Sequence, residues 1–297
     1  MPRANANGIQ LEYETFGDTS APALLLVAGN GVQMLFWEAE FCTKLADKGL
    51  FVIRFDNRDA GLSTKFEQAG TPDFMEAIND MIKGRPLNPP YTLNDMADDC
   101  VGLLDALHIR KAHIFGASMG GMIAQVAAYR HANRFLSLTS LMSNTGNPHS
   151  AQGQPEALQA VLAPQPQGRT AIIEHTITVW KKIWSAGFPF EEERARDFIE
   201  KSYDRSFCPG GGARQNIAQL AGGDRTSMLA KITMPALVIH GSADPLIPVA
   251  VGAETAKAIP NARLLVIEGM GHDMPKGCWQ KIIDEVSRHA LQADLRA

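Results

Sequence analysis

One serine of the chain, Ser118, lies in a setting that suits a nucleophile. It stands between Gly116 and Gly120, after the apolar run 113–115 and before an Ala- and Met-rich stretch, 119–129, with helical spacing of its apolar residues. A serine mounted in this way occupies a sharp turn from strand to helix, where a Cβ on either neighbour would strike backbone. The alternative is a Gly-Ser loop that only turns the chain, but the strand before it and the helix after it favour a nucleophile.

A serine hydroxyl is a poor nucleophile at neutral pH, so Ser118 needs a histidine base and a carboxylate that orients the base. His272 ends a glycine-rich loop that follows an apolar run, and Asp244 follows another such run. The chain order Ser, Asp, His is one of the known orders for a catalytic triad. Asp224 and Asp273 are alternatives for the acid, although neither directly follows a clear strand.

Acyl transfer also requires a pair of backbone N–H groups directed at the oxyanion. Met119, the residue after the nucleophile, is expected to provide one of them. The other is expected from the loop Ala28-Gly29-Asn30-Gly31, which follows the apolar run 24–27, with Asn30 as the first choice. Glycine on both sides of Asn30 lets this backbone turn close to a substrate. A plain Gly-Asn-Gly turn is the alternative interpretation.

Short, nearly continuous apolar runs indicate the strands that would position these residues, because strands covered on both faces of a parallel sheet lose the usual alternation. The runs span 24–27, 51–55, 113–115, 136–141, 236–239 and 264–267. Residues 93–107 repeat apolar side chains every three and four positions, which predicts a helix and the strand-helix-strand order of an α/β protein. The alternating segment 9–14 predicts an antiparallel strand. His113 and His240 lie within or at the end of predicted strands, where a structural role is expected.

The segment 145–228 departs from this order, and it predicts an inserted helical cap on a core domain made of residues 1–144 and 229–297. It holds amphipathic stretches at 171–184, 191–206 and 213–221, with Pro- and Gly-rich joints and no clear strand. Such an insertion is expected over the carboxyl ends of the strands, where Ser118 points. Trp180 and Trp184, four apart on one predicted helical face, are expected to line the substrate pocket with Gly31 and Met142. A place in the cap core is an equally good interpretation of the two tryptophans.

The composition is that of an ordinary globular protein, with 45% hydrophobic and 20% charged residues in a chain of 297. The formal net charge of -4 offers no basic face for nucleic acid. The first residues lack the apolar core of a signal peptide, and no apolar run is long enough to span a membrane, so a cytoplasmic protein is expected. Four scattered cysteines are interpreted as free thiols, and no metal or other cofactor is expected. Monomer and homodimer both stay open.

Taken together, these residues resemble the α/β-hydrolase superfamily over essentially the whole chain, with residues 116–120 as its nucleophile elbow. Residues 55–63, Phe-Asp-Asn-Arg-Asp-Ala-Gly-Leu-Ser, are similar to the family's Asp-x-Arg-Gly-x-Gly-x-Ser loop, and residues 235–241 resemble its lead-in to the acid. Ala28-Gly29 replaces the commoner His-Gly of the oxyanion loop. That departure, together with Gly269-Met270-Gly271-His272, is most similar to the branch that contains aclacinomycin methylesterase and related small-molecule esterases.

The resemblance implies an α/β-hydrolase fold, in which a mostly parallel central sheet is flanked by helices and carries an inserted helical cap. It also implies a serine hydrolase that cleaves a small, fairly apolar carboxylic ester, such as a methyl ester, through an acyl-enzyme. Ser118 would attack, His272 would move the proton and Asp244 would hold its tautomer, while Asp56 and Arg58 would support the oxyanion turn. Carbon–carbon bond hydrolysis, peracid formation and a non-enzymatic ligand receptor that keeps the triad are alternatives on the same fold.

Overall fold

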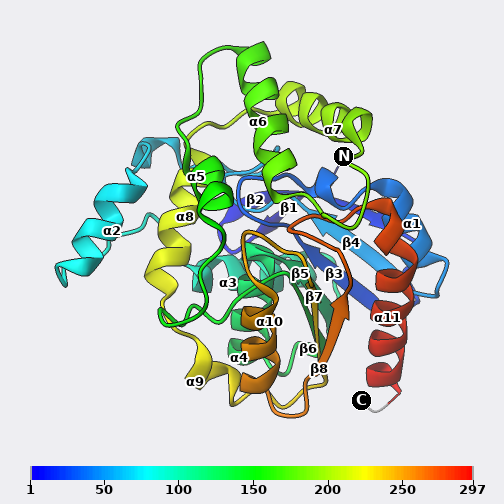
Figure 1. The fold of residues 1–297 in the computed structure, drawn as a ribbon. Coiled ribbons are helices and arrows are strands. Elements are labelled where there is room, and N and C mark those ends of the chain that lie inside the picture. Colours follow the sequence, from blue (N-terminus) through cyan, green and yellow to red (C-terminus); the bar gives the residue numbers. More distant parts are fainter. Residues whose placement is uncertain (1, 296–297) are drawn as a thin grey trace.

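The computed structural model describes residues 2–295, which form an eight-stranded sheet with helices on both faces (Figure 1). The strands are β1 (Arg3–Ala6), β2 (Ile9–Phe16), β3 (Ala23–Val27), β4 (Phe51–Phe55), β5 (Ala112–Ala117), β6 (Phe135–Leu141), β7 (Ala236–Gly241) and β8 (Arg263–Ile267). The helices are α1 (Ala39–Ala46), α2 (Phe74–Ile82), α3 (Leu93–Ala106), α4 (Met119–Arg130), α5 (Pro155–Leu162), α6 (Arg169–Ile183), α7 (Glu192–Arg205), α8 (Gly211–Gly222), α9 (Thr226–Leu229), α10 (Val249–Ala258) and α11 (Lys276–Asp294), with 3₁₀ turns η1 (Met34–Phe36) and η2 (Glu67–Ala69).

The order of the strands places the loop after β3, which contains Asn30, beside the turn after β5, which contains Ser118. The order is β1-β2-β4-β3-β5-β6-β7-β8, and every pair from β4 to β8 in that order is parallel. The hairpin β1-β2 and the pair β2-β4 are antiparallel. Because β3 lies between β4 and β5, the strand order reverses there, at the kind of crevice where open α/β sheets bind ligands. The predicted mostly parallel sheet is confirmed, and Val27 at the end of β3 pairs with Gly116 of β5.

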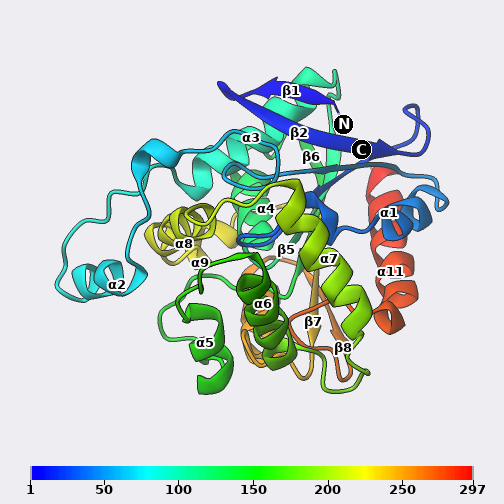
Figure 2. The ribbon, with the colours of Figure 1, turned by 90° about the horizontal axis from the view of Figure 1, so that it is seen from above.

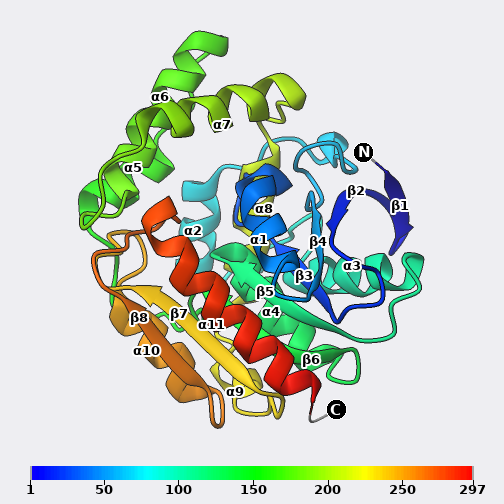
Figure 3. The same ribbon diagram turned by 90° about the vertical axis from the view of Figure 1, so that its right-hand side faces the viewer.

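Helices cover both faces of the sheet, with α1 and α11 on one face and α3, α4 and α10 on the other (Figure 3). The five residues of β3 are all buried, and they alternate between two apolar cores. Leu25 and Val27 belong to the core under α3 and α4, whereas Leu24 and Leu26 belong to the core under α1 and α11. A strand that is apolar at every position therefore fills both layers, as its sequence predicted.

The last strand, β8, differs from the expectation that its apolar sequence raised. It is an edge strand, and the side chains of Leu264 and Val266 are 37% and 39% exposed. The run of apolar residues therefore predicts the strand correctly but is wrong about burial on both faces. The sequence pattern shows that the residues of β8 are apolar, but it does not show that β8 lies at the edge of the sheet. At the edge, some of these side chains have no helix or strand packed over them.

Helices α5 to α9 connect β6 to β7, and α5, α6 and α7 lie above the sheet (Figures 1 and 2). Helices α6 and α7 share a small core of their own, in which Ile173 and Ile177 meet Ile199. Helix α8 packs against α2 and α3, and α9 packs against α4 and α10. The later part of the insertion is therefore attached closely to the helices that cover the sheet.

Candidate active site

The turn at Ser118 has the strained geometry of a nucleophile mount. Ser118 lies between β5 and α4, and its backbone has φ 53° and ψ -119°, a region that residues with a side chain rarely adopt. A Cβ on Gly116 would lie 1.9 Å from the carbonyl oxygen of Gly120, and a Cβ on Gly120 would lie 2.1 Å from that of Val27. Both glycines are therefore required by close backbone contacts, as the sequence pattern predicted.

The structure brings Ser118, His272 and Asp244 together in one chain of hydrogen bonds. The Nε2 atom of His272 lies 3.0 Å from the Oγ atom of Ser118, and its Nδ1 atom lies 2.9 Å from Oδ2 of Asp244. Asp244 follows β7 and His272 follows β8, so the carboxyl ends of neighbouring parallel strands deliver both side chains. Oriented in this way, the imidazole can accept a proton from the hydroxyl while the carboxylate fixes its tautomer.

Asp244 is buried and held at both carboxylate oxygens. Its Oδ1 atom accepts hydrogen bonds from the backbone N–H groups of Leu246 and Ile247, at 2.9 and 2.8 Å. The Nε2 atom of His240 lies 3.4 Å from Oδ2 and also donates to the carbonyl of Ile247 at 2.7 Å. Burial raises the pKa of Asp244, but the charge of His272 and hydrogen bonds from both histidines outweigh it, so the pKa lies well below its ordinary range.

The two alternative acids lie elsewhere. Asp224 is exposed, and its Oδ1 atom accepts hydrogen bonds from the backbone and hydroxyl of Thr226. Asp273 is buried beside the candidate base, but its Oδ1 atom accepts from the hydroxyl of Ser185 at 2.5 Å. That hydroxyl in turn accepts the N–H of Gly271 at 2.7 Å, so the insertion helps to hold the histidine loop. No sequence pattern pointed to this contact.

Asp273 gives the protein a titrating group near neutrality. Burial raises the pKa of Asp273 to about 7, against the lowering effect of the Ser185 hydrogen bond and of His272. Between the ordinary aspartate pKa near 4 and this value, the folded protein keeps a proton that the unfolded chain has released. Stability therefore falls as the pH rises through that window, and the loss is complete above about pH 7.

Replacement of Asp273 by asparagine is expected to remove this loss. The variant should be more stable than the wild type at pH 8, by up to about 4 kcal/mol, and the difference should vanish as the pH approaches 4. Urea unfolding of both proteins between pH 4 and pH 8.5 measures it. Equal pH dependence of the two unfolding free energies would show that Asp273 is ionised in both states.

The two expected oxyanion donors, the backbone N–H groups of Met119 and Asn30, have no acceptor in the described part of the chain. A Cβ on Gly29 would lie 3.4 Å from the Cβ of Ser118, so this loop packs directly on the elbow. The N–H of Gly31, in contrast, donates to the side chain of Gln215 at 2.7 Å, a contact that the sequence did not reveal.

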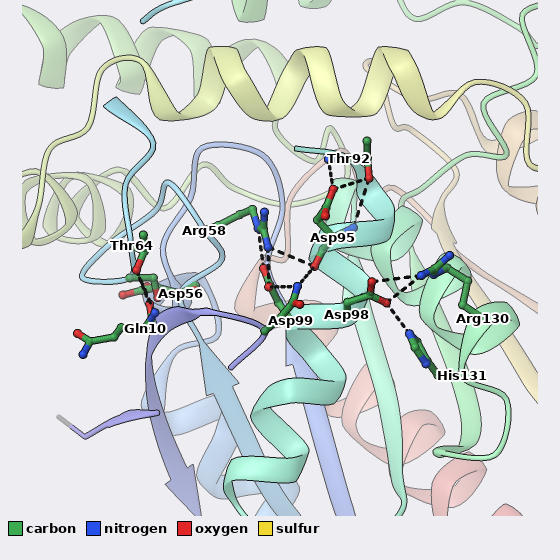
Figure 4. Close-up of polar contacts among 12 residues, drawn as sticks. Gln10, Asp56, Arg58, Thr64, Thr92, Asp95, Asp98, Asp99, Arg130 and His131 are labelled. Atoms are coloured by element: carbon green, nitrogen blue, oxygen red, sulfur yellow. Dashed lines mark hydrogen bonds and ion pairs between the residues drawn. The ribbon is translucent and has the colours of Figure 1, made fainter. Parts of the chain in front are cut away.

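The loop that follows β4, which contains Asp56 and Asn57, makes hydrogen bonds to the oxyanion loop and to the turn after it, as expected for Asp56. Asp56 accepts the N–H of Met34, and the side-chain amide of Asn57 donates to the carbonyl of Ala28. Figure 4 shows the side chain of Arg58 directed onto α3. There both of its hydrogen bonds to the carboxylate of Asp99 measure 2.7 Å.

A cavity of about 1250 Å³ opens at Ser118 between the sheet and the insertion. The four residues expected in the pocket all border it: Gly31, Met142, Trp180 and Trp184. The expectation that the tryptophans share one helical face is wrong, because α6 ends at Ile183 and Trp184 has an extended backbone. Trp180 stacks on Phe198 of α7, with ring centroids 5.1 Å apart. Each tryptophan therefore combines a place at the cavity with packing inside the insertion.

Two further findings concern the described residues 2–295. They contain no group of three or more His, Cys, Asp or Glu side chains arranged to hold a metal ion. None of their helices is long and apolar enough to cross a membrane.

Comparison with known proteins gives related sequences and shared folds. Residues 22–275 match the family described as alpha/beta hydrolase fold. The chain is 29% identical to rhodomycin D methylesterase DauP of a Streptomyces species over 96% of each chain, and 29% identical to 3-oxoadipate enol-lactonase 2 of Acinetobacter baylyi over 89% of this chain and 86% of the relative. A meta-cleavage product hydrolase from Pseudomonas fluorescens has the same fold, with a TM-score of 0.77 and 22% identity over 99% of this chain and 98% of the other.

Proposed function

This chain belongs to the α/β-hydrolase family, and from that premise we propose that it is a serine hydrolase that cleaves a fairly apolar carboxylic ester. Ser118 attacks the ester carbonyl, and the Nε2 atom of His272 takes the proton of its hydroxyl. Asp244 holds the imidazole in the tautomer with hydrogen on Nδ1. The N–H groups of Met119 and Asn30 donate hydrogen bonds to the carbonyl oxygen and stabilise the negative charge that develops on it.

The second half of the reaction returns the enzyme to its starting state. His272 gives its proton to the alcohol as the carbon–oxygen bond breaks, which leaves the acyl group on Ser118. Water then enters, and its oxygen attacks the acyl carbon while the Nε2 atom of His272 accepts one of its protons. His272 returns this proton to the Oγ atom of Ser118 as the bond between Oγ and the acyl carbon breaks and the acid leaves. The observation that carries this proposal is the continuous hydrogen-bond chain from Ser118 to Asp244, with distances of 3.0 and 2.9 Å, beside two free backbone donors.

The cavity bears on the size of the ester. Ligand pockets commonly measure about 300–1,000 Å³, so 1250 Å³ exceeds what a short-chain ester fills. We therefore propose a substrate with a bulky apolar part on one side of the ester bond and a small group on the other. A methyl ester fits this description, and a methylesterase is among the relatives at 29% identity.

A screen of esters tests the proposal. p-Nitrophenyl esters of increasing acyl length, and methyl esters of monocyclic to polycyclic aromatic acids, are incubated with the protein, and release of alcohol is measured. We expect turnover of activated short esters and a higher kcat/KM for bulky methyl esters. Turnover confined to carbon–carbon bond cleavage or to peracid formation from acetate and hydrogen peroxide would contradict ester hydrolysis. Binding of the same esters without any turnover would favour a receptor.

Trp180 is expected to influence substrate preference more than the chemical step. Its ring borders the cavity and makes contacts that a bound ester keeps in ground and transition states alike, and loss of such contacts raises KM while kcat persists. Trp180→Ala should shift the preference across the acyl series, whereas Trp180→Phe should retain part of it. An unchanged preference in the alanine variant would assign Trp180 to the core of α6 and α7 only.

A further inference from the structure

Gln215 of α8 bridges the two loops that meet beneath the insertion. Its Oε1 atom accepts the N–H of Gly31 at 2.7 Å, and its Nε2 atom donates to the carbonyl of Arg58 at 2.8 Å. The residue is completely buried, so water does not replace either bond. One turn earlier in the same helix, the carbonyl of Gly212 accepts the side-chain amide of Asn30 at 3.1 Å. Helix α8 thus holds both Asn30 and the residue that follows it.

The helix is itself fixed to the core. Arg214 forms two hydrogen bonds of 2.7 Å to the carboxylate of Asp59, and it donates to the carbonyl of Gly70 at 2.6 Å. A Cβ on Gly211 would lie 2.2 Å from the carbonyl oxygen of Asp59, so the start of α8 lies against the loop backbone. Such contacts are those of a rigid support and differ from those of a lid that moves freely.

The other end of the bridge is equally fixed. Arg58 pairs with Asp99 on α3 (Figure 4). Its guanidinium also lies over the rings of Phe66 and Tyr91. Its carbonyl is therefore a stationary acceptor for Gln215. A side chain held at one end by this carbonyl presents its other end to Gly31 in a fixed position.

The bridge determines which N–H of the loop is available. The N–H of Gly31 is occupied by Gln215, which leaves the N–H of Asn30, the residue after the Gly29 that packs on Ser118, without an acceptor among residues 2–295. Gly31 has φ +67°, a conformation that a residue without a side chain can leave easily once its hydrogen bond is lost. Loss of the bridge would thus release the peptide unit between Asn30 and Gly31, which is the neighbour of the peptide that carries the proposed oxyanion donor.

We infer that Gln215, contributed by the insertion, is a positioning residue for the oxyanion loop, and that α8 belongs to the frame of the active site. The inference rests on the proposed function of Ser118 and Asn30. It assigns to the insertion an influence on the chemical step as well as on substrate choice. Removal of one oxyanion donor lowers kcat by about 10²- to 10³-fold, so displacement of the donor is expected to lower kcat by part of that factor.

Gln215→Met tests the inference, because methionine keeps the length of the side chain and removes both hydrogen bonds. Its matched control is Gln125→Met: Gln125 is also completely buried on a helix, and its amide pairs with Ser140 and Arg225 at its two ends. We expect kcat to fall about 10- to 100-fold in Gln215→Met with KM within about threefold, and kcat to persist in the control. The affinity for a trifluoromethyl ketone, which forms a tetrahedral adduct with a serine, should fall by the same factor as kcat/KM.

Two results would overturn the inference. One is a kcat within twofold of wild type in the methionine variant. The other is a reduced kcat with unchanged affinity for the ketone. Hydrogen exchange of the peptide that covers residues 28–34 provides a readout without catalysis, and Gln215→Met should accelerate it. An ester-inactive wild type would contradict the proposed function. If the wild type is active but Gln215→Met leaves this exchange unaltered, the bridge alone is contradicted.

Gln215→Glu decides the question if the methionine variant does not fold. A protonated carboxyl can reproduce both hydrogen bonds of the amide, but a carboxylate cannot donate to the carbonyl of Arg58. The charged side chains near Gln215 form two separate ion pairs, Arg58 with Asp99 and Arg214 with Asp59. Relative to wild type at the same pH, kcat of this variant should therefore rise severalfold from pH 8 to pH 6. A constant ratio contradicts the inference.

Discussion

Replacement of Ser118 by alanine is expected to lower kcat for esters by a factor of about 10⁴ to 10⁶, with little change in thermal stability. In the proposed mechanism this hydroxyl is the group that forms the acyl-enzyme, so its removal leaves the reaction without its nucleophile. In the structure its hydrogen bond goes to the Nε2 atom of His272, and the side chain is partly open to the cavity, so its removal costs little packing. Turnover of p-nitrophenyl acetate and the melting temperature measure the two effects.

Ser137→Ala is the matched control for this variant. Ser137 is also bonded to a histidine, with its Oγ atom 2.8 Å from Nδ1 of His113, but it lies inside the sheet on β6. Its replacement should lower stability and leave kcat unchanged. If Ser118→Ala kept a tenth of wild-type turnover, Ser118 would not be the nucleophile.

Asp244→Asn is expected to lower kcat about 10⁴-fold by forcing the wrong tautomer of His272. The two backbone N–H groups of Leu246 and Ile247 both donate to Oδ1, so the asparagine oxygen must stay there. Its NH₂ group then faces Nδ1 of His272, which can pair with it only as an acceptor. The proton of the imidazole moves to Nε2, and that nitrogen can no longer accept the hydroxyl proton of Ser118.

The same reasoning gives the control for the acid. Asp224 is exposed, and its carboxylate accepts the backbone N–H of Thr226. Because it makes no contact with His272, Asp224→Asn should leave kcat at the wild-type value. The pre-steady-state burst of p-nitrophenol, which reports acylation, should be lost in Asp244→Asn and kept in Asp224→Asn. The reverse result would assign the role of the acid to Asp224.

The residues of the proposed triad were accessible from the sequence because each lies directly after a strand or in the loop that follows one. The apolar run 236–239 predicted most of β7 (Ala236–Gly241), and the run 264–267 predicted all but the first residue of β8. In a parallel sheet the ends of such strands share one edge, so the order of the runs also predicts that Asp244 and His272 lie near Ser118. Local pattern and chain direction were sufficient for this part.

The supporting contacts were not accessible, because they join segments that only the fold brings together. Gly31 and Gln215 are 184 residues apart, and Ser185 and Asp273 are 88 apart. A glutamine inside an amphipathic stretch carries no local sign of its partner. Helix α2 was not predicted from the sequence, and in the structure its apolar residues Met75 and Ile82 are exposed.

The attachment of the insertion at separate points has a consequence for how specificity can diverge. Residues 155–182, which form α5 and most of α6, make no hydrogen bond to the loops of Asn30, Ser118 or His272 within the described part of the chain. Residues 183–185 and 212–215 do make such bonds. Residues 155–182 are therefore the part to exchange in chimaeras designed to accept new esters. A chimaera that also replaces residues 183–185 and 212–215 must take the loops of Asn30 and His272 from the same donor protein. Different parts of one insertion thus affect substrate range and turnover rate, so substrate range can change while the turnover rate is kept.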